Sequence, residues 1–230
     1  MSYREELINS IERNFLFSKK PINRLKYKSI NNKNNNLDKI EKINNLKKQI
    51  DSIHNCNLKD KSKNLILGDG NIESPIMIVG EAPGSEEEKT KKTFQGESGE
   101  LLEKMLLAIN LKKNNLYSCY AINFRTPEDR KPTTQEIKRY SHFLKDHISI
   151  IDPKIIILLG STAMEAIIPS NQKISQERGK WKEIILKNKT YPLMTTFSPS
   201  YLIRFPENKK FSWEDLKKIK QKLLDLKIQI

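Results

Sequence analysis

One stretch, residues 75–102 (PIMIVGEAPGSEEEKTKKTFQGESGELL), constrains the fold of this chain more than any other. It opens with four consecutive apolar residues at 76–79, a pattern typical of a strand that is buried on both faces of a parallel sheet. The turn GEAPG follows, and its glycines and proline can hold Glu81 at the carboxyl end of the strand. Apolar residues at helical spacing then begin at Leu101. The stretch therefore predicts strand, loop and helix, with the loop at the edge where open α/β sheets bind ligands.

Strand and helix patterns alternate along the rest of the chain. Three further sheet strands are expected at residues 116–122, 155–159 and 191–197. Residues 181–186 are expected to form the outer arm of a hairpin with the last of these strands. Thr133 and Glu136 have the spacing of a capping box at the start of a helix. Ser212 and Asp215 repeat that spacing before the last helix, which would bury Trp213. We therefore predict an α/β fold with three layers, α/β/α, around a central four-stranded, mostly parallel sheet.

The chain is expected to have two parts, a basic N-terminal extension at residues 1–63 and a folded domain at residues 64–230. The extension should contain a short helix over residues 1–16, an Asn- and Lys-rich linker over residues 17–36, and a second helix from Leu37. A net charge of +14 favours an anionic partner such as nucleic acid. Most of the basic residues are lysines, however, and a lysine-rich proteome would give the same charge without such a partner.

Composition also limits the cofactors and the location of the protein. The two cysteines, Cys56 and Cys119, are too few for a disulfide framework or for a metal site made of four thiolates. The three histidines are scattered, so no metal site is expected. Nothing in the sequence has the pattern of a signal peptide or a membrane-spanning segment. We therefore expect a soluble, cytoplasmic monomer with no membrane partner.

Two motifs point to a known family. The run GEAPGSEEE, followed by TFQGESGELL, resembles the first motif of family-four uracil-DNA glycosylases, which is approximately GEAPGxxED and then PFVGxAGxLL. The run SPSYLIR at residues 198–204 resembles their second motif, HPSxxL or HPAYLLR, with Ser198 in place of the histidine. Residues 56–70 resemble the segment that precedes the first strand in proteobacterial members. The resemblance then continues to the C-terminus and implies a uracil-DNA glycosylase-like fold.

The resemblance implies that a carboxylate acts in the site, because cleavage of a glycosidic bond passes through a sugar cation that an anion stabilises. Glu81 is the first candidate and Glu87 the second, whereas Glu86 and Glu88 are expected in solvent. Ser198 stands where the histidine of the family stabilises negative charge on the departing base. A hydroxyl group can donate a hydrogen bond there but carries no positive charge. About 1.5–3 kcal/mol of stabilisation, or roughly 10- to 100-fold in rate, is therefore at risk.

Base recognition is expected to depend on the first motif and on the second strand. Phe94 matches the phenylalanine on which the family stacks the flipped base, and Gly80 and Ala82 are expected to lie beside that base. Tyr120 aligns with the asparagine that recognises uracil. Either Tyr120 fills the pocket and changes which base fits, or the register slips and Asn123 recognises the base. Both alternatives are open at this point.

Contacts with the DNA backbone or groove, rather than with the base, are expected from four residues, Arg130, Pro199, Ser200 and Arg204. Members of the family also hold an iron–sulfur cluster on four cysteines. Of those positions only Cys56 matches a cysteine here, and Phe124 and Tyr140 stand at two of the others. Since such a cluster needs four thiolates, no cofactor is expected.

The resemblance implies an enzyme of base excision repair. It would flip a deaminated base, uracil first, out of DNA and hydrolyse the N-glycosidic bond. The replacements at Ser198 and Tyr120 leave a second hypothesis open, in which the chain binds DNA with the glycosylase fold but has weak or no catalytic activity.

Overall fold

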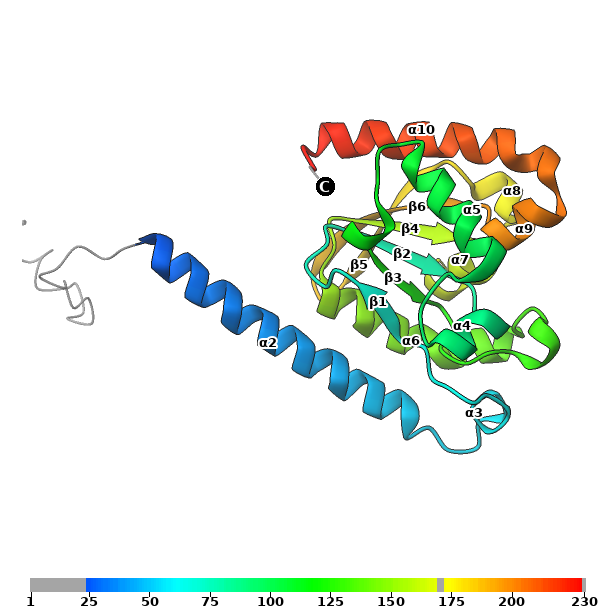
Figure 1. Cartoon of the computed structure of the whole chain (residues 1–230), viewed down its shortest axis with the longest axis horizontal. Helices are drawn as coiled ribbons and strands as arrows, with labels where there is room; N and C mark the ends of the chain where they lie inside the picture. Colours follow the sequence, from blue (N-terminus) through cyan, green and yellow to red (C-terminus); the bar gives the residue numbers. More distant parts are fainter. Residues whose placement is uncertain (1–23, 169–171, 229–230) are drawn as a thin grey trace, which may run out of the picture. The chain divides into compact units, whose positions relative to one another are not determined.

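The computed structural model of the protein describes residues 24–168 and 172–228 (Figure 1). Contacts divide the chain into two units, residues 1–37 and residues 38–230. In the first unit the described residues form the beginning of helix α2 (Arg24–Asp51). The helix expected over residues 1–16 lies outside the described residues.

Helix α2 is longer than the sequence predicts, because residues 24–36 are helical and not a linker. Asparagine disfavours a helix only modestly, so a helix that is stable further along can extend through such a run. The later part of α2 belongs to the second unit, where Leu46 and Ile50 are buried in the core. The boundary between an extension and a domain at residue 63 stays a prediction.

The second unit is built on a six-stranded sheet in the order β1-β3-β2-β4-β6-β5. Its four central strands are parallel, namely β3 (Tyr117–Tyr120), β2 (Ile76–Gly80), β4 (Ile155–Leu159) and β6 (Lys189–Thr196). Two antiparallel strands form the edges, β1 (Gly68–Gly70) and β5 (Trp181–Leu186). The predicted parallel centre is confirmed, but the count of four strands is too low for the whole sheet. The sequence GDG of β1 has no apolar pattern by which a strand could be predicted.

Helices cover both faces of the sheet, as the continuous apolar strands require. Met77 and Val79 point to one face and pack with α6 (Thr134–Ile151) and α7 (Ser161–Ile167). Ile76 and Ile78 point to the other face, which α5 (Gly96–Leu107) and α10 (Lys209–Asp225) cover. The predicted three-layer α/β/α fold is therefore confirmed (Figure 1).

One of the two predicted helix caps is correct. At α6 the Thr133 hydroxyl oxygen accepts the Glu136 N–H (3.3 Å), and the Glu136 carboxylate accepts the Thr133 N–H (2.7 Å). Helix α10, in contrast, begins at Lys209, so the predicted cap at Ser212 is wrong. Ser212 and Asp215 are buried inside the helix, whereas Trp213 is 44% exposed. The spacing of a capping box is also that of two residues on one helix face, and here it marks the buried face.

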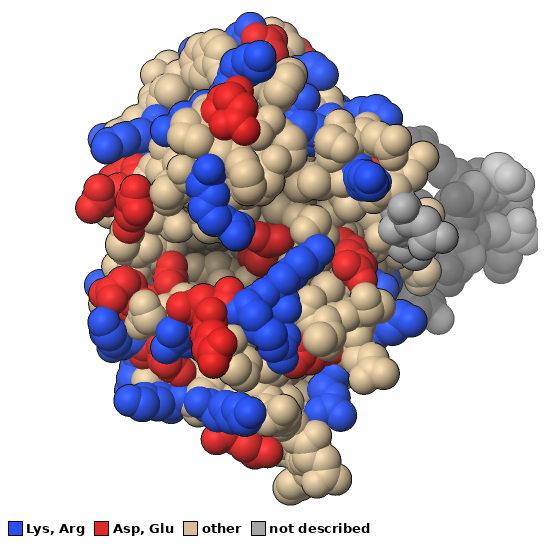
Figure 2. All heavy atoms as spheres, turned by 90° about the vertical axis from the view of Figure 1, so that its right-hand side faces the viewer, with Lys and Arg blue, Asp and Glu red and all other residues tan. Residues whose placement is uncertain are grey.

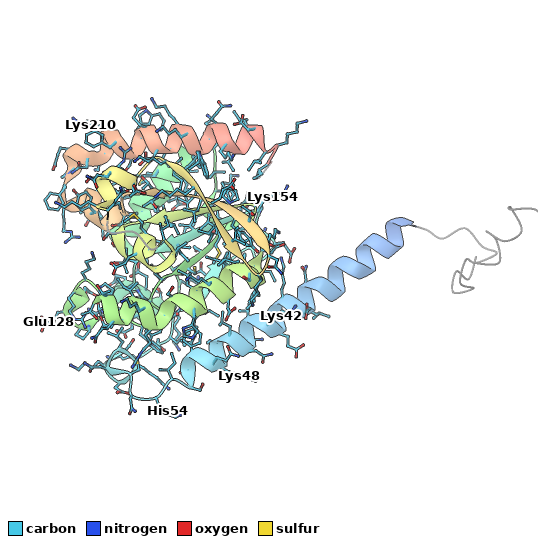
Figure 3. All side chains as sticks on the ribbon, turned by 180° about the vertical axis from the view of Figure 1, so that it is seen from behind. Lys42, Lys48, His54, Glu128, Lys154 and Lys210 are labelled. Atoms are coloured by element: carbon cyan, nitrogen blue, oxygen red, sulfur yellow. The ribbon has the colours of Figure 1, made fainter. Side chains whose placement is uncertain are left out.

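The parallel strands all deliver their following loops to one edge of the sheet. Figure 3 shows Lys154, just before β4, and Lys210, at the start of α10, on opposite sides of the second unit. The shorter helices are α3 (Asn57–Lys61), α4 (Ser85–Thr90), α8 (Ile174–Glu177) and α9 (Pro199–Arg204). Of these, α4 follows β2 and α9 follows β6. Across the described residues, no helix combines the length and the apolar character needed to cross a membrane.

Candidate active site

A cavity of about 590 Å³ lies at the carboxyl edge of the parallel strands. Figure 2 faces this side of the molecule and shows basic and acidic side chains interspersed around a central hollow. Eleven of the twelve predicted site residues line the cavity, namely Gly80, Glu81, Ala82, Glu87, Phe94, Tyr120, Arg130, Ser198, Pro199, Ser200 and Arg204. Asn123 is the residue that the structure does not bring there. The two motifs therefore converge, although residues 103–197 separate them in the chain.

Glu81 follows β2 directly, and its carboxylate is held by the start of α7, the helix that follows the neighbouring strand β4. The Thr162 N–H donates to Oε1 at 3.0 Å and the Ser161 hydroxyl donates to the same oxygen at 3.4 Å. In the part of the chain that the structure describes, Oε2 has no hydrogen-bond partner. One oxygen is thus fixed, and the other is available to a substrate or a water molecule.

Gly160 makes room for this carboxylate. Its φ is +100°, and a Cβ atom there would lie 2.4 Å from Glu81 Cδ and 2.7 Å from Oε1. Only glycine adopts such a backbone conformation without strain while leaving that space empty. Gly160 directly follows the strand expected at residues 155–159, but its role could not be predicted from that position alone.

Phe94 and Tyr120 form the aromatic wall of the cavity. Their rings lie 5.0 Å apart and are tilted by 41°. The Phe94 N–H donates to the Tyr120 hydroxyl oxygen (2.7 Å), and that hydroxyl group donates to Glu87 Oε1 (3.2 Å). Burial, together with the nearby Glu87 carboxylate, raises the pKa of Tyr120 well above its usual value. The phenol therefore stays protonated and keeps this arrangement at physiological pH.

The Glu87 carboxylate accepts three hydrogen bonds, which hold the loop after β2 in place. Besides the Tyr120 hydroxyl group, it accepts the Gln95 N–H at Oε1 and the Gly84 N–H at Oε2, both at 2.9 Å. These bonds connect the start of α4 to the segment that carries Phe94. The geometry thus favours a positioning role for Glu87, whereas Glu81 has the uncommitted oxygen that a catalytic role requires.

Tyr120 and Asn123 lie in different surroundings. Asn123 is buried. Its side-chain amide donates to the Ile66 carbonyl oxygen (3.2 Å), and its backbone carbonyl oxygen accepts the Ile66 N–H (2.9 Å). Tyr120 instead pairs with Gly80 in the sheet, and a Cβ atom at Gly80 would lie 2.6 Å from the Tyr120 ring. Tyr120 therefore lines the cavity and Asn123 does not, which favours the first alternative, and the contact of either residue with a base stays a prediction.

The second motif forms the opposite side of the cavity. Ser198 precedes α9 and its hydroxyl group lies 3.2 Å from that of Ser200, while Arg204 Nε donates to the Ser200 carbonyl oxygen (3.3 Å). Tyr201 stacks between two further rings, with centroid distances of 4.8 Å to Phe197 and 4.9 Å to Phe205. Arg204 is exposed at the entrance. The motif therefore presents hydroxyl groups inside and a positive charge outside.

The loop after β3 completes the rim and is fixed by ion pairs. Arg130 pairs with Glu136 through two hydrogen bonds (2.7 and 2.9 Å), which lower the pKa of Glu136 to about 2. Arg125 binds Asp129 (2.7 and 2.9 Å) and approaches Glu88. Glu128, labelled in Figure 3, has a positive φ of 55° in this loop. The arginines of this rim are therefore paired with nearby carboxylates, and these pairs hold the loop in place.

The two outer acids of the first motif have different environments. Glu86 is exposed, as predicted, and it pairs with Lys89. Glu88 is only 8% exposed, and its Oε1 accepts the Lys63 N–H (2.7 Å) and the Ser62 hydroxyl group (2.8 Å), so the prediction of a solvated side chain is wrong. Its partners lie some 25 residues away in the chain, which no local pattern indicates.

Comparison with known proteins decides the family of the chain. The model of the family described as "Uracil DNA glycosylase superfamily" matches residues 67–220. The chain belongs to the uracil DNA glycosylase superfamily. The matched range contains both motifs and all strands of the sheet, so the predicted resemblance is confirmed.

Similar members of the superfamily are named type-4 uracil-DNA glycosylases. The protein of Thermotoga maritima is 35% identical over 168 residues, which are 72% of this chain and 86% of that protein. The protein of Sulfurisphaera tokodaii is 33% identical over 193 residues, 80% of this chain and 85% of that protein. The protein of Archaeoglobus fulgidus is 29% identical over 184 residues, 78% of this chain and 92% of that protein.

The positions that correspond to the family's iron–sulfur cluster meet in this fold, but they do not provide its ligands. Cys56 Sγ lies 3.1 Å from the Tyr140 hydroxyl group, and the Phe124 ring lies edge-on to Tyr140 at 6.2 Å. All three side chains are buried. The other cysteine, Cys119, lies in β3, where burial raises its pKa. One thiol, a phenol and an apolar ring do not fit a cluster that binds four thiolates.

Sequence reasoning missed one further contact that shapes the site. Arg178 forms a buried ion pair with Asp215, and Asp215 also accepts the Thr196 hydroxyl group (2.7 Å). The guanidinium group of Arg178 lies over the Phe197 ring, 5.7 Å from its centroid. This pair fixes the end of β6 and therefore the second motif. The signal in the sequence was the position of Asp215, which lies beside Leu216 and four residues before Ile219 on the apolar face of α10. That position was interpreted as part of a helix cap.

Proposed function

We propose that the chain is a DNA glycosylase that flips a deaminated base, uracil first, out of DNA and hydrolyses its N-glycosidic bond. The observation that carries this proposal is the Glu81 carboxylate, which is held on one oxygen and free on the other inside the cavity. Membership of the superfamily supports the reaction class. Glu81 is the catalytic residue of the proposal.

The proposed reaction needs an anion beside the sugar. As the bond to the base breaks, positive charge develops on the sugar, and a fixed carboxylate stabilises it without reorganisation. The free Oε2 of Glu81 can also orient the attacking water. Phe94 and Tyr120 supply the surface against which the base lies, and Ser198 offers a hydroxyl donor to its carbonyl oxygen.

DNA is the proposed partner of the rim. Arg204 is exposed at the cavity entrance beside Ser200 and Pro199, and Arg130 retains N–H groups beyond those that bind Glu136. Such contacts bind phosphates independently of sequence. We propose that the protein acts as a cytoplasmic monomer.

A direct test incubates the protein with oligonucleotides that contain one uracil, hypoxanthine or xanthine and then cleaves abasic sites with alkali. Strand cleavage that depends on the damaged base supports the enzyme. Binding without cleavage of any of the three would favour the second hypothesis, a DNA-binding protein with the same fold, which the replacements at Ser198 and Tyr120 permit.

Ser198→His is expected to increase uracil excision by about 10- to 100-fold, because an imidazole can carry positive charge where negative charge develops on the base. Single-turnover excision measures the change, and Ser198→Ala, which removes the hydroxyl donor, should be slower than the parent. A histidine variant that binds DNA normally but excises no faster would show that position 198 does not limit the reaction.

The purified protein is expected to be colourless and free of iron, because Phe124 and Tyr140 stand where a cluster needs thiolates. Anaerobic purification followed by iron determination and a visible absorption spectrum provides the measurement. Stoichiometric iron with broad visible absorption would contradict the expectation.

A further inference from the structure

The hydroxyl group of Tyr120 has a fixed hydrogen-bond assignment in the cavity wall. It accepts the Phe94 N–H (2.7 Å), and it donates to Glu87 Oε1 (3.2 Å) because a carboxylate cannot donate. Its only proton is therefore committed. A lone pair on the oxygen remains, so Tyr120 can accept a further hydrogen bond but cannot donate one.

The Glu87 carboxylate, which binds the Tyr120 hydroxyl group, likewise has no hydrogen-bond donor to offer. Glu87 accepts from Gln95, Gly84 and Tyr120, and as an anion it offers only further acceptor capacity. An asparagine amide at position 120 would offer both a donor and an acceptor. The wall formed by Tyr120 and Glu87 presents acceptors alone.

Deamination changes one ring nitrogen in a way that such a wall can detect. Cytosine has a lone pair at N3 and adenine has one at N1. In their deamination products, uracil and hypoxanthine, the same nitrogen carries a hydrogen and becomes a donor, and xanthine carries a hydrogen at N1 as well. An acceptor opposite this nitrogen forms a hydrogen bond with the deaminated base and faces an unpaired lone pair in the parent base.

We propose that Tyr120 recognises this ring N–H, so that the site favours uracil over cytosine and hypoxanthine over adenine. Uracil and hypoxanthine both carry a carbonyl group beside this N–H, so contacts with that edge do not distinguish the two bases. Guanine and thymine carry the same N–H, so the acceptor separates uracil from cytosine and hypoxanthine from adenine only. The inference rests on the proposed function, because it requires a flipped base in the cavity.

Two measurements test the proposal. Single-turnover excision by the unmodified protein should proceed at rates within about tenfold for uracil and hypoxanthine, since one lost hydrogen bond changes a rate by about that factor. Binding is measured with duplexes that carry a 2′-fluoro nucleotide opposite an abasic-site analogue, because fluorine slows cleavage and pairing no longer differs. Uracil should bind about tenfold more tightly than cytosine, and hypoxanthine about tenfold more tightly than adenine.

The variants separate Tyr120 from its surroundings. Tyr120→Phe should reduce both binding ratios to near one, whereas Tyr120→Asn, whose amide oxygen is an acceptor, should keep both ratios above one. Tyr117→Phe is the matched control, because Tyr117 lies on the same strand, binds His147 at 2.8 Å and packs on the opposite face of the sheet. It should keep both ratios of the parent.

The outcomes distinguish this inference from the proposed function. If excision fails for every base but the binding ratios depend on Tyr120, the glycosylase activity is refuted and the recognition by Tyr120 stands. If uracil is excised more than about 100-fold faster than hypoxanthine, or if Tyr120→Phe keeps both ratios, the inference is overturned while the activity stands.

Discussion

Replacing Glu81 by glutamine is expected to slow uracil excision by about 100- to 10,000-fold, the range over which a positioned acid or base contributes to catalysis. The amide has the size of the carboxylate but no charge to stabilise the sugar cation. It can still bind the Thr162 N–H through its carbonyl oxygen, so the fold around it should persist. Single-turnover excision measures the loss, and thermal unfolding checks that stability is retained.

Glu86→Gln provides the matched control for that variant. Glu86 lies in the same motif, is exposed and pairs with Lys89 on the surface, outside the cavity. The Glu86→Gln substitution removes the same charge from the same segment. The excision rate of this variant should stay within a factor of about two of the parent, because surface substitutions usually have small effects. An equal loss in both variants would assign the effect to net charge near the DNA and would remove Glu81 from its catalytic role.

Gly160→Ala is expected to reduce excision by about 100-fold or more, although residue 160 itself has no side chain to contact a substrate. The added methyl group would lie 2.4 Å from Glu81 Cδ, so the carboxylate must move, and a displacement of about 1 Å can cost that much in rate. The positive φ of 100° adds a backbone penalty of about 1–3 kcal/mol to the free energy of folding. Excision and unfolding measurements are both needed.

Gly96→Ala separates these two effects. Gly96 also has a positive φ, of 62°, but a Cβ atom there would meet no atom closer than 3.3 Å, and that atom belongs to the exposed Glu86. It should lose stability to a similar extent and retain most of the activity. If both alanine variants lose activity equally, backbone strain and not the displacement of Glu81 explains the loss.

The sequence was sufficient for the central sheet and for the residues of the two motifs. The apolar run at 76–79 and the turn after it already place Glu81 at a strand end, and parallel strands bring their carboxyl ends to one edge. Phe94 and Ser198 followed from the spacing of the motifs. Each of these predictions depends on short stretches of chain, where local pattern determines the structure.

The contacts that give the site its chemistry depend on pairing between distant segments, and these could not be predicted. The bond between Tyr120 and Glu87 requires the register in which Gly80 pairs with Tyr120. The position of Gly160 against Glu81 likewise requires that β2 and β4 are neighbours. Asp215 was misinterpreted for the same reason, because its partners Arg178 and Thr196 come from other elements.

The amount of free base that the protein releases in a single turnover tests the proposed glycosylase activity directly. A duplex with one uracil is incubated with excess protein, and released uracil is quantified by chromatography, with an identical thymine-containing duplex as reference. The proposed activity predicts about one equivalent of free uracil from the first duplex, none from the second, and release that is slowed at least about 100-fold in Glu81→Gln. A protein that binds the uracil duplex but releases no uracil would contradict it.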